Sequence, residues 1–150
     1  MNEKYIKRAI ELAKEAMKED EVPVGAVIVY NNEIIGEGKN ERNNSKLISR
    51  HAEIIAIENA QRKINQTMLE NCDIYVTLEP CIMCASAIQQ ARIKNVYFGT
   101  KDIRMGGYGS KIDVSAIQGL NHYPIIHQIK NQDECGQILK DFFKRIRSAK

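Results

Sequence analysis

The 150-residue sequence has no tryptophan, only three prolines, and no apolar run near the ~18 residues that would suggest a membrane span. Its first 20 residues, MNEKYIKRAIELAKEAMKED, are charged throughout and lack the apolar core of a secretory signal. Without an export signal, the four cysteines are better explained as thiols or metal ligands than as a disulfide framework. We therefore expect a cytoplasmic protein that does not enter a membrane.

Neither sign of charge dominates the chain. Lysine and arginine together number 22 against 19 aspartates and glutamates, which gives a net charge of +3. This balance permits a nucleic-acid partner but does not by itself indicate one, because strongly basic binding domains have a pI above about 9. The length and the 43% hydrophobic fraction are those of an ordinary globular chain, and they predict one domain over residues 1–150.

The apolar pattern predicts a mixed α/β domain. Helical periodicity predicts four helices, at residues 3–20, 51–64, 81–92 and 133–150. Runs of β-branched and aromatic residues predict five strands, at residues 22–30, 33–38, 72–78, 95–100 and 123–129. Asn31 and Asn32 form a hairpin signal between the first two strands, and residues 39–50 are expected to be a loop. The strand–helix–strand order that follows implies a parallel pair joined by a crossover.

Cys81 and Cys84 stand three residues apart at the start of a predicted helix, so both sulfurs emerge on one side of its first turn. A helix N-terminus favours the thiolate that both redox chemistry and metal binding require. A thioredoxin-like redox pair would follow the first strand of a βαβ pattern, whereas here a hairpin and a helix come first. A closed structural zinc site could add His122 and His127, but the intervening segment is far larger than a zinc finger encloses.

A catalytic zinc site is the third interpretation, and it uses the RHAEI segment. His51 and Glu53 begin the preceding predicted helix, so two helix N-termini can converge at one edge of the sheet. Ligation by His51, Cys81 and Cys84 leaves one tetrahedral position open for water, as in catalytic zinc sites. Glu53 can then transfer protons without binding the metal. His-x-Glu followed by Pro-Cys-x-x-Cys is the motif of the zinc nucleobase deaminases.

The sequence resembles the bacterial tRNA-specific adenosine deaminases, within the cytidine deaminase-like superfamily. The resemblance covers nearly the whole chain and is carried by EVPVGAVIV, HAEI, YVTLEPCIMCASAI, RIKNVYFGTKD, GGYGS, LNH and DECGQILKDFFKRIR. HAE and PCxxC alone define the zinc deaminases, and the LNH and DFFKRIR segments narrow the match to the tRNA enzymes. The resemblance implies a three-layer α/β/α cytidine deaminase-like fold with a mixed five-stranded sheet.

This resemblance implies hydrolytic deamination of adenosine to inosine at the wobble position of a tRNA anticodon, chiefly that of an arginine tRNA. It assigns one Zn²⁺ per subunit to His51, Cys81 and Cys84, and proton transfer to Glu53. It also implies a homodimer, for which the alanine-rich helix at residues 81–92 offers weak independent support. The alternative for these alanines is packing against the sheet of their own chain.

The resemblance further implies substrate contacts for Asn40, Asp102, Phe143 and Arg147 on an anticodon stem-loop. Each has an ordinary structural alternative: a turn cap for Asn40, a solvated acid for Asp102, a core position for Phe143. An aromatic side chain among cations suits stacking and phosphate neutralisation on a single-stranded loop. The same cations could instead complement the dipole of a final helix. They are Lys140, Lys144, Arg145, Arg147 and Lys150.

Three residues depart from the usual family pattern: Lys39, Arg50 and Tyr123. They do not alter the expected zinc chemistry. They affect only how closely the surface that would bind the RNA loop follows that of the family. Two rival functions stay open. One is a free-base or nucleotide deaminase of the same fold, such as guanine or cytosine deaminase, which would not need the FFKRIR segment as an RNA surface. The other is an RNA-binding protein with structural zinc, which would tolerate loss of Glu53.

Overall fold

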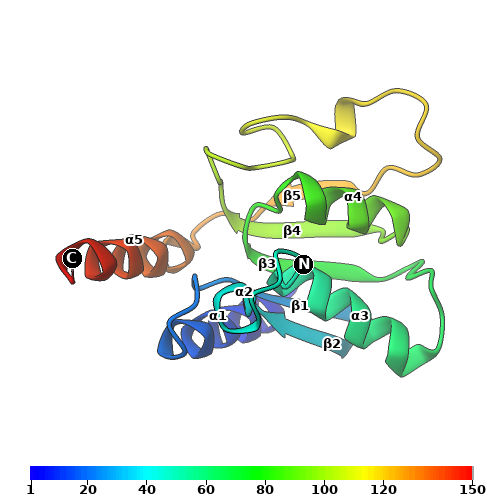
Figure 1. Ribbon diagram of the computed structural model, residues 1–150. Helices are drawn as coiled ribbons and strands as arrows, with labels where there is room; N and C mark the ends of the chain where they lie inside the picture. The colour runs from blue at the N-terminus through cyan, green and yellow to red at the C-terminus, as the bar shows by residue number, and fades with distance from the viewer. Residues whose placement is uncertain (150) are drawn as a thin grey trace.

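Five strands form one mixed sheet with helices on both faces in a computed structural model that describes residues 1–149 (Figure 1). The strands are β1 (Gly25–Tyr30), β2 (Glu33–Lys39), β3 (Asp73–Leu78), β4 (Asn95–Thr100) and β5 (Ile125–Gln128). Their spatial order is β2-β1-β3-β4-β5. β1 runs antiparallel to both of its neighbours, whereas β3, β4 and β5 are mutually parallel. The predicted hairpin and the predicted parallel crossover are both confirmed.

The helices form a layer on each face of the sheet. Helices α1 (Glu3–Lys18) and α5 (Asp133–Ser148) pack with one apolar cluster, and α3 (Ala52–Ile64) and α4 (Ile82–Gln90) with the other. Each helix buries an apolar stripe against the strands, as its periodicity predicts. The expected three-layer α/β/α arrangement is therefore confirmed. Among residues 1–149, no helix is both long enough and apolar enough to cross the hydrocarbon core of a bilayer.

The backbone of α3 lies very close to β2, and this contact sets the position of the first turn of the helix. Gly36 and Gly38 face this helix, and a Cβ added to Gly38 would lie 2.2 Å from the carbonyl oxygen of Ala52. A Cβ added to Gly36 would lie 2.4 Å from the carbonyl oxygen of Ala56. Only glycine allows the helix backbone to lie this close to the strand. The contact holds the first turn of α3, and with it His51, at one edge of the sheet.

The structure corrects several bounds expected from the sequence: β1 begins at Gly25 and not at residue 22, β5 covers Ile125–Gln128 and not 123–129, and α4 covers Ile82–Gln90 and not 81–92. The segment predicted as a loop at 39–50 contains a short helix, α2 (Arg42–Ser45), which is too short to show an apolar periodicity. Its first backbone N–H groups are bound by the buried carboxylate of Glu21, which accepts from Asn43 at 2.9 Å and from Asn44 at 2.7 Å. Helix α1 ends at Lys18 and not at residue 20, because Asp20 has a left-handed backbone with φ of 60°.

Candidate zinc-dependent active site

The starts of α3 and α4 lie together and bring three metal-binding side chains to one point. His51 is the N-cap residue of α3 and Cys81 that of α4, and neither side chain makes a capping hydrogen bond. Their side chains are therefore free to face each other. His51 Nδ1 lies 3.6 Å from Cys81 Sγ and 3.5 Å from Cys84 Sγ. The three donor atoms all lie within 4.8 Å of one another.

These separations fit a tetrahedral zinc ion. Bonds of about 2.3 Å to sulfur and about 2.0–2.1 Å to nitrogen at a tetrahedral angle place the two ligand atoms about 3.6 Å apart. The measured nitrogen–sulfur separations of 3.5 and 3.6 Å agree with that value. His51, Cys81 and Cys84 therefore form a zinc site, and three protein ligands leave one position of the tetrahedron for water or substrate.

The pKa values of the two cysteine thiols also favour binding of a cation. Hydrogen bonds from Cys84 and His51 lower the pKa of Cys81 to about 4, against the opposing effect of burial. The hydrogen bond to the Cys81 thiolate and burial raise the pKa of Cys84 far above its usual value. The protein alone thus favours one thiolate and leaves the second sulfur protonated. A divalent cation removes this conflict, because metal binding displaces the remaining proton.

Glu53 lies in the first turn of α3 with 4% of its surface exposed. Burial raises the pKa of its carboxyl to about 7, and the negative charge of Cys81 acts in the same direction. Glu53 is not part of the metal-binding cluster found within residues 1–149. A carboxyl group with a pKa near neutrality can both accept and return a proton under physiological conditions, as a general acid and base must.

Asn40 has a structural contact, but at a helix start and not the turn cap that was its alternative. Its Oδ1 accepts a hydrogen bond from the backbone N–H of Ala52 at 2.8 Å, so it caps the start of α3 directly beside His51. This bond uses the acceptor of the amide and fixes the orientation of the group. The two N–H donors of the same amide are left for a ligand.

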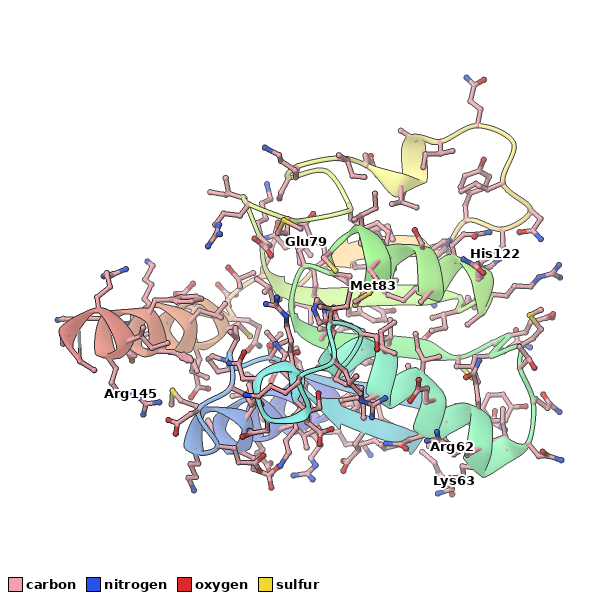
Figure 2. All side chains as sticks on the ribbon, viewed as in Figure 1. Arg62, Lys63, Glu79, Met83, His122 and Arg145 are labelled. Carbon is pink, nitrogen blue, oxygen red and sulfur yellow. The ribbon has the colours of Figure 1, made fainter. Side chains whose placement is uncertain are left out.

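Asp102 is a half-buried loop acid whose side chain bonds to the backbone of its own loop. Its Oδ1 accepts hydrogen bonds from the backbone N–H groups of Arg104 at 3.1 Å and Met105 at 3.2 Å. Its own N–H donates to Oε1 of Glu79 at 3.2 Å. Asp102 therefore shapes the turn that follows β4, and its loop is attached to the segment that leads into the zinc ligands. Figure 2 shows Glu79 where the chain passes from β3 to α4.

Phe143 and Arg147 lie on α5, which projects from the side of the molecule where α3 and α4 begin (Figure 1). Phe143 is 38% exposed, whereas the neighbouring Phe142 is 1% exposed, so Phe142 is the core residue of this pair. Arg147 is exposed. Arg145 instead donates to the carbonyl oxygen of Met17 at 3.3 Å. Lys150 lies outside the described residues.

Two residues near the site were not singled out from the sequence. Glu79 is fully buried, and Tyr108, from the glycine-rich loop, packs against the core beside Glu53 and Cys84. Burial and the charges of those two neighbours raise the pKa of the Tyr108 phenol well above its usual value. The one available signal was the glycine-rich GGYGS motif. The bonds of Glu79 to loop backbone and of the Tyr108 hydroxyl to the Ala85 carbonyl oxygen are tertiary contacts that a sequence pattern does not contain.

The two histidines considered for a closed zinc site have other partners. His122 Nε2 lies 2.7 Å from the carbonyl oxygen of Ile93, and His127 Nε2 lies 3.1 Å from Asn95 Oδ1. Neither joins the metal-binding cluster found among residues 1–149. The zinc site is therefore the open, three-ligand kind, and the closed structural interpretation is wrong.

The three departures from the family pattern are also engaged within the chain. Lys39 forms an ion pair with Glu19, and Arg50 Nη1 lies 2.8 Å from Glu58 Oε1. The hydroxyl of Tyr123 donates to the carbonyl oxygen of Ile117 at 2.7 Å. All three side chains thus have partners within the chain, and their effect on the surface that would bind the RNA stays a prediction.

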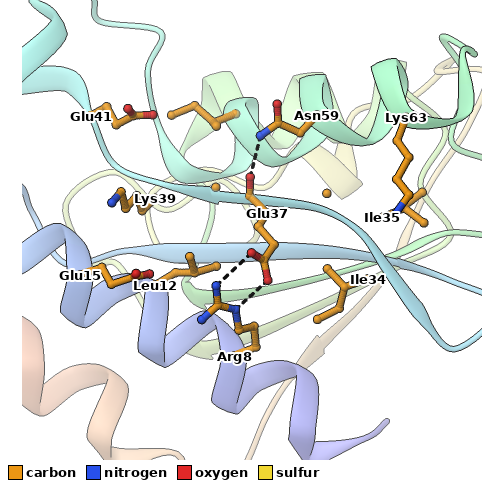
Figure 3. A pocket seen from close by; sticks show the side chains of 13 residues that line it. Arg8, Leu12, Glu15, Ile34, Ile35, Glu37, Lys39, Glu41, Asn59 and Lys63 are labelled. Atoms are coloured by element: carbon orange, nitrogen blue, oxygen red, sulfur yellow. Dashed lines mark hydrogen bonds and ion pairs between the residues drawn. The ribbon is translucent and has the colours of Figure 1, made fainter.

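A separate hollow of about 640 Å³ runs along β2 between α1 and α3 (Figure 3). Arg8 crosses it with two hydrogen bonds to the carboxylate of Glu37, at 2.7 and 3.0 Å. Asn59 donates to the backbone carbonyl oxygen of Glu37 at 2.9 Å. These bonds occupy polar groups along an edge strand, which limits pairing with another chain. The zinc ligands do not line this hollow.

Comparison with known proteins agrees with this geometry. Residues 1–100 match the cytidine and deoxycytidylate deaminase zinc-binding region. The chain is 40% identical to the tRNA-specific adenosine deaminase of Aquifex aeolicus (strain VF5), over 97% of this chain and 96% of that protein. A structure from a study of A-to-I editing by tRNA:A34 deaminases has a TM-score of 0.89 and 34% identity, over 92% of this chain and 100% of that chain. A guanine deaminase from Bacillus subtilis has a TM-score of 0.64 and 28% identity, over 99% and 95% of the two chains.

Proposed function

Because this chain belongs to the cytidine and deoxycytidylate deaminase zinc-binding family, we propose that it hydrolyses adenosine to inosine at wobble position 34 of a tRNA anticodon. The observation that carries the proposal is the similarity to tRNA deaminases along almost the full chain. The TM-score of 0.89 to a tRNA:A34 deaminase exceeds the 0.80 and 0.64 to two guanine deaminases. We therefore propose tRNA, and not a free base or nucleotide, as the substrate. The first tRNA to test is an arginine tRNA.

The site supplies the groups that this reaction needs. Zinc held by His51, Cys81 and Cys84 supplies a water activated for attack on the amine-bearing carbon of the base. With zinc bound, Glu53 would take a proton from the attacking water and pass it to the purine ring nitrogen. It would then pass a second proton, from the hydroxyl added to the ring carbon, to the amine, which leaves as ammonia. Its raised pKa of about 7 suits both transfers. Burial of the carboxyl also keeps bulk water from competing for this proton.

Asn40 binds the flipped-out base in this proposal. Its amide is oriented by the cap bond to Ala52 N–H, so the remaining N–H donors are held in one place beside His51. An oriented donor loses little side-chain entropy when it binds, which favours recognition of one base in one pose. The cap and the substrate contact are compatible roles of one side chain.

Helix α5 contacts the anticodon loop in this proposal. Phe143 offers an exposed aromatic ring, and the exposed Lys144 and Arg147 lie one and four residues further along the same helix. Such a combination suits base stacking together with phosphate neutralisation on single-stranded RNA. Asp102, on the loop after β4, is proposed as a further contact to the same loop.

A homodimer is also proposed, on different support from that expected. Ala85 of α4 and its C-cap residue Ala91 are buried in the core of their own chain, so they are not available for close contact with a partner. Large apolar side chains are instead exposed on the first turn of α4 and on the loop after β4. They are Ile82, Ile103, Met105 and Ile112. Large exposed apolar side chains on two neighbouring segments favour a protein–protein contact there.

One assay tests the proposed function. The pure protein is incubated with an unmodified anticodon stem-loop of an arginine tRNA carrying adenosine at position 34, and the digested RNA is analysed for inosine. Parallel reactions contain free guanine, cytosine or deoxycytidylate, and the Glu53→Ala variant is the negative control. We expect inosine only with the stem-loop. If a free base or nucleotide is converted and no inosine forms in the RNA, the tRNA function is refuted and the protein is a free-base or nucleotide deaminase.

A further inference from the structure

Glu79 is a buried carboxylate that binds one loop at several points. It is 1% exposed and lies two residues before the zinc ligand Cys81. Its oxygens accept from the backbone N–H groups of Asp102 at 3.2 Å, Tyr108 at 2.9 Å and Ser110 at 3.3 Å. The Ser110 hydroxyl is a fourth donor. Because a buried charge is costly unless hydrogen bonds satisfy it, these donors and the carboxylate hold each other in place.

The same loop lies directly on the segment that carries the zinc ligand. The N–H of Gly107 donates to the carbonyl oxygen of Pro80 at 2.8 Å, and Gly106 pairs with Cys81 as an isolated β-bridge. A Cβ on Gly106 would lie 2.4 Å from Glu79 Oε2, so no larger residue fits between loop and carboxylate. The loop at residues 102–110 and the ligand Cys81 therefore move together.

This loop reaches two parts of the proposed active site. At its start, the backbone N–H of Asp102 is bound to Glu79, while the Asp102 carboxylate fixes the following turn. Near its end, the N–H of Tyr108 is bound to Glu79, and the Tyr108 ring packs beside the helix that carries Cys84. One carboxylate thus sets the position of the loop at both ends.

We propose that Glu79 is a positioning residue, which holds the loop at residues 102–110 in register with Cys81 so that Asp102 meets the RNA at a fixed distance from the zinc site. The proposal rests on the function proposed above. A glutamine at position 79 keeps the shape but replaces one acceptor oxygen by an NH₂ group that faces backbone N–H donors. Such a group cannot accept their hydrogen bonds, so that side of the loop is released.

The test compares Glu79→Gln with Ser110→Ala, which removes a single donor and is the milder change if the first variant folds poorly. The matched control is Ser115→Ala, because the Ser115 hydroxyl is buried without a hydrogen-bond partner within residues 1–149. We expect Glu79→Gln to raise KM for the anticodon stem-loop about tenfold, with kcat and zinc content little changed. Ser110→Ala should raise KM less, and Ser115→Ala should leave it unchanged.

A double-mutant cycle separates positioning from general stabilisation. If Glu79 acts through Asp102, Glu79→Gln should raise KM little further once Asp102→Ala is present, because the side chain that Glu79 positions has then been removed. Additive effects on KM, or a lower melting temperature with KM unchanged in both Glu79→Gln and Ser110→Ala, would overturn the proposal.

Hydrogen exchange gives a readout that does not depend on the substrate. Backbone amides of Asp102, Tyr108 and Ser110 should exchange faster in Glu79→Gln, while those of α3 keep their protection. Unchanged exchange in the loop would overturn the proposed role of Glu79, even with an active wild type. Absence of inosine with the wild-type protein would instead refute the proposed function.

Discussion

At the scale of single residues, the site separates metal binding from proton transfer. His51 and Glu53 are two positions apart on α3, yet only His51 belongs to the metal-binding cluster, while Glu53 is buried beside it. The helix start makes this possible, because an N-cap residue has an extended backbone and points its side chain differently from a residue within the first turn. Two chemical roles are thus obtained from one short segment.

Replacing Glu53 tests this separation. In Glu53→Gln we expect zinc near one ion per chain and a kcat reduced by about 10²–10⁴-fold, since the amide cannot transfer the proton. Elemental analysis and the rate of inosine formation measure the two quantities. Glu58→Gln, on the same helix but paired with Arg50 at the surface, is the matched control and should keep both. Loss of zinc in Glu53→Gln would mean that Glu53 supports the metal and not only the proton transfer.

The sequence predicted the zinc ligands because their spacing is itself the signal. Cys81 and Cys84 lie three residues apart at one helix start, His51 begins another helix, and together they match the His-x-Glu and Pro-Cys-x-x-Cys motif of the zinc deaminases. Glu79 escaped prediction for a physical reason. Its partners are mostly backbone N–H groups of a loop, and those positions depend on the path of the loop and not on residue type. The bond from Asn40 to the start of α3 was not predicted, because it joins residues 12 positions apart, and the substrate contact of Asn40 stays a prediction.

At the scale of secondary-structure elements, α5 has one face in the core and another exposed. Phe142 and Phe143 are adjacent, and their exposed fractions are 1% and 38%. We expect Phe142→Ala to lower the free energy of unfolding by about 3–5 kcal/mol, as for other buried aromatics. Phe143→Ala should change stability far less but weaken stem-loop binding by about 1–3 kcal/mol, because a base can no longer stack on the ring. Urea unfolding and stem-loop titration measure the pair, and equal stability losses would assign Phe143 to the core.

The cations of α5 provide a second test of this element. Lys144→Ala combined with Arg147→Ala should weaken stem-loop binding and lower the salt slope by about 0.7 for each phosphate that is no longer neutralised. Turnover at saturating substrate should change much less. The control is Arg62→Ala with Lys63→Ala, an equal charge change at the far end of α3, away from α5 (Figure 2). If both double variants weaken binding and change the salt slope equally, the effect is one of overall charge, and the cations of α5 do not contact the RNA.

Element prediction succeeded where an apolar stripe or a β-branched run was long enough to show its period, as in α1, α3 and the central strands. It missed α2, whose four residues include no buried side chain. Helix α2 is held by Glu21, a buried acid that binds Asn43 and Asn44 across a long stretch of sequence. Such a tertiary contact stabilises a helix that its local sequence would not form.

At the scale of the whole molecule, the proposed dimer makes a prediction about mass. Light scattering should give about twice the 17.1 kDa of one chain. Ile103, which is 81% exposed, lies on the proposed contact surface, so Ile103→Asp should shift the protein toward monomer. Ile125→Asp, at an exposed position on β5, should leave the mass unchanged. If the two chains shape a common site, the Ile103→Asp monomer also loses activity, whereas a fully active monomer would rule out shared sites.

The zinc ligands come from two helix starts, with His51 and Cys81 separated by 30 positions in the chain. An ion bound to both ends closes that stretch, which contains α3 and β3, into a loop. For a disulfide, closing a loop of about 30 residues stabilises the fold by roughly 3–4 kcal/mol, mainly by restricting the unfolded chain. A bound zinc ion would therefore tether the start of α3 to the start of α4, two helices of one layer, as well as serving the reaction. Withdrawing zinc from the protein accordingly reduces the population of folded chains, and not only the turnover of those that stay folded.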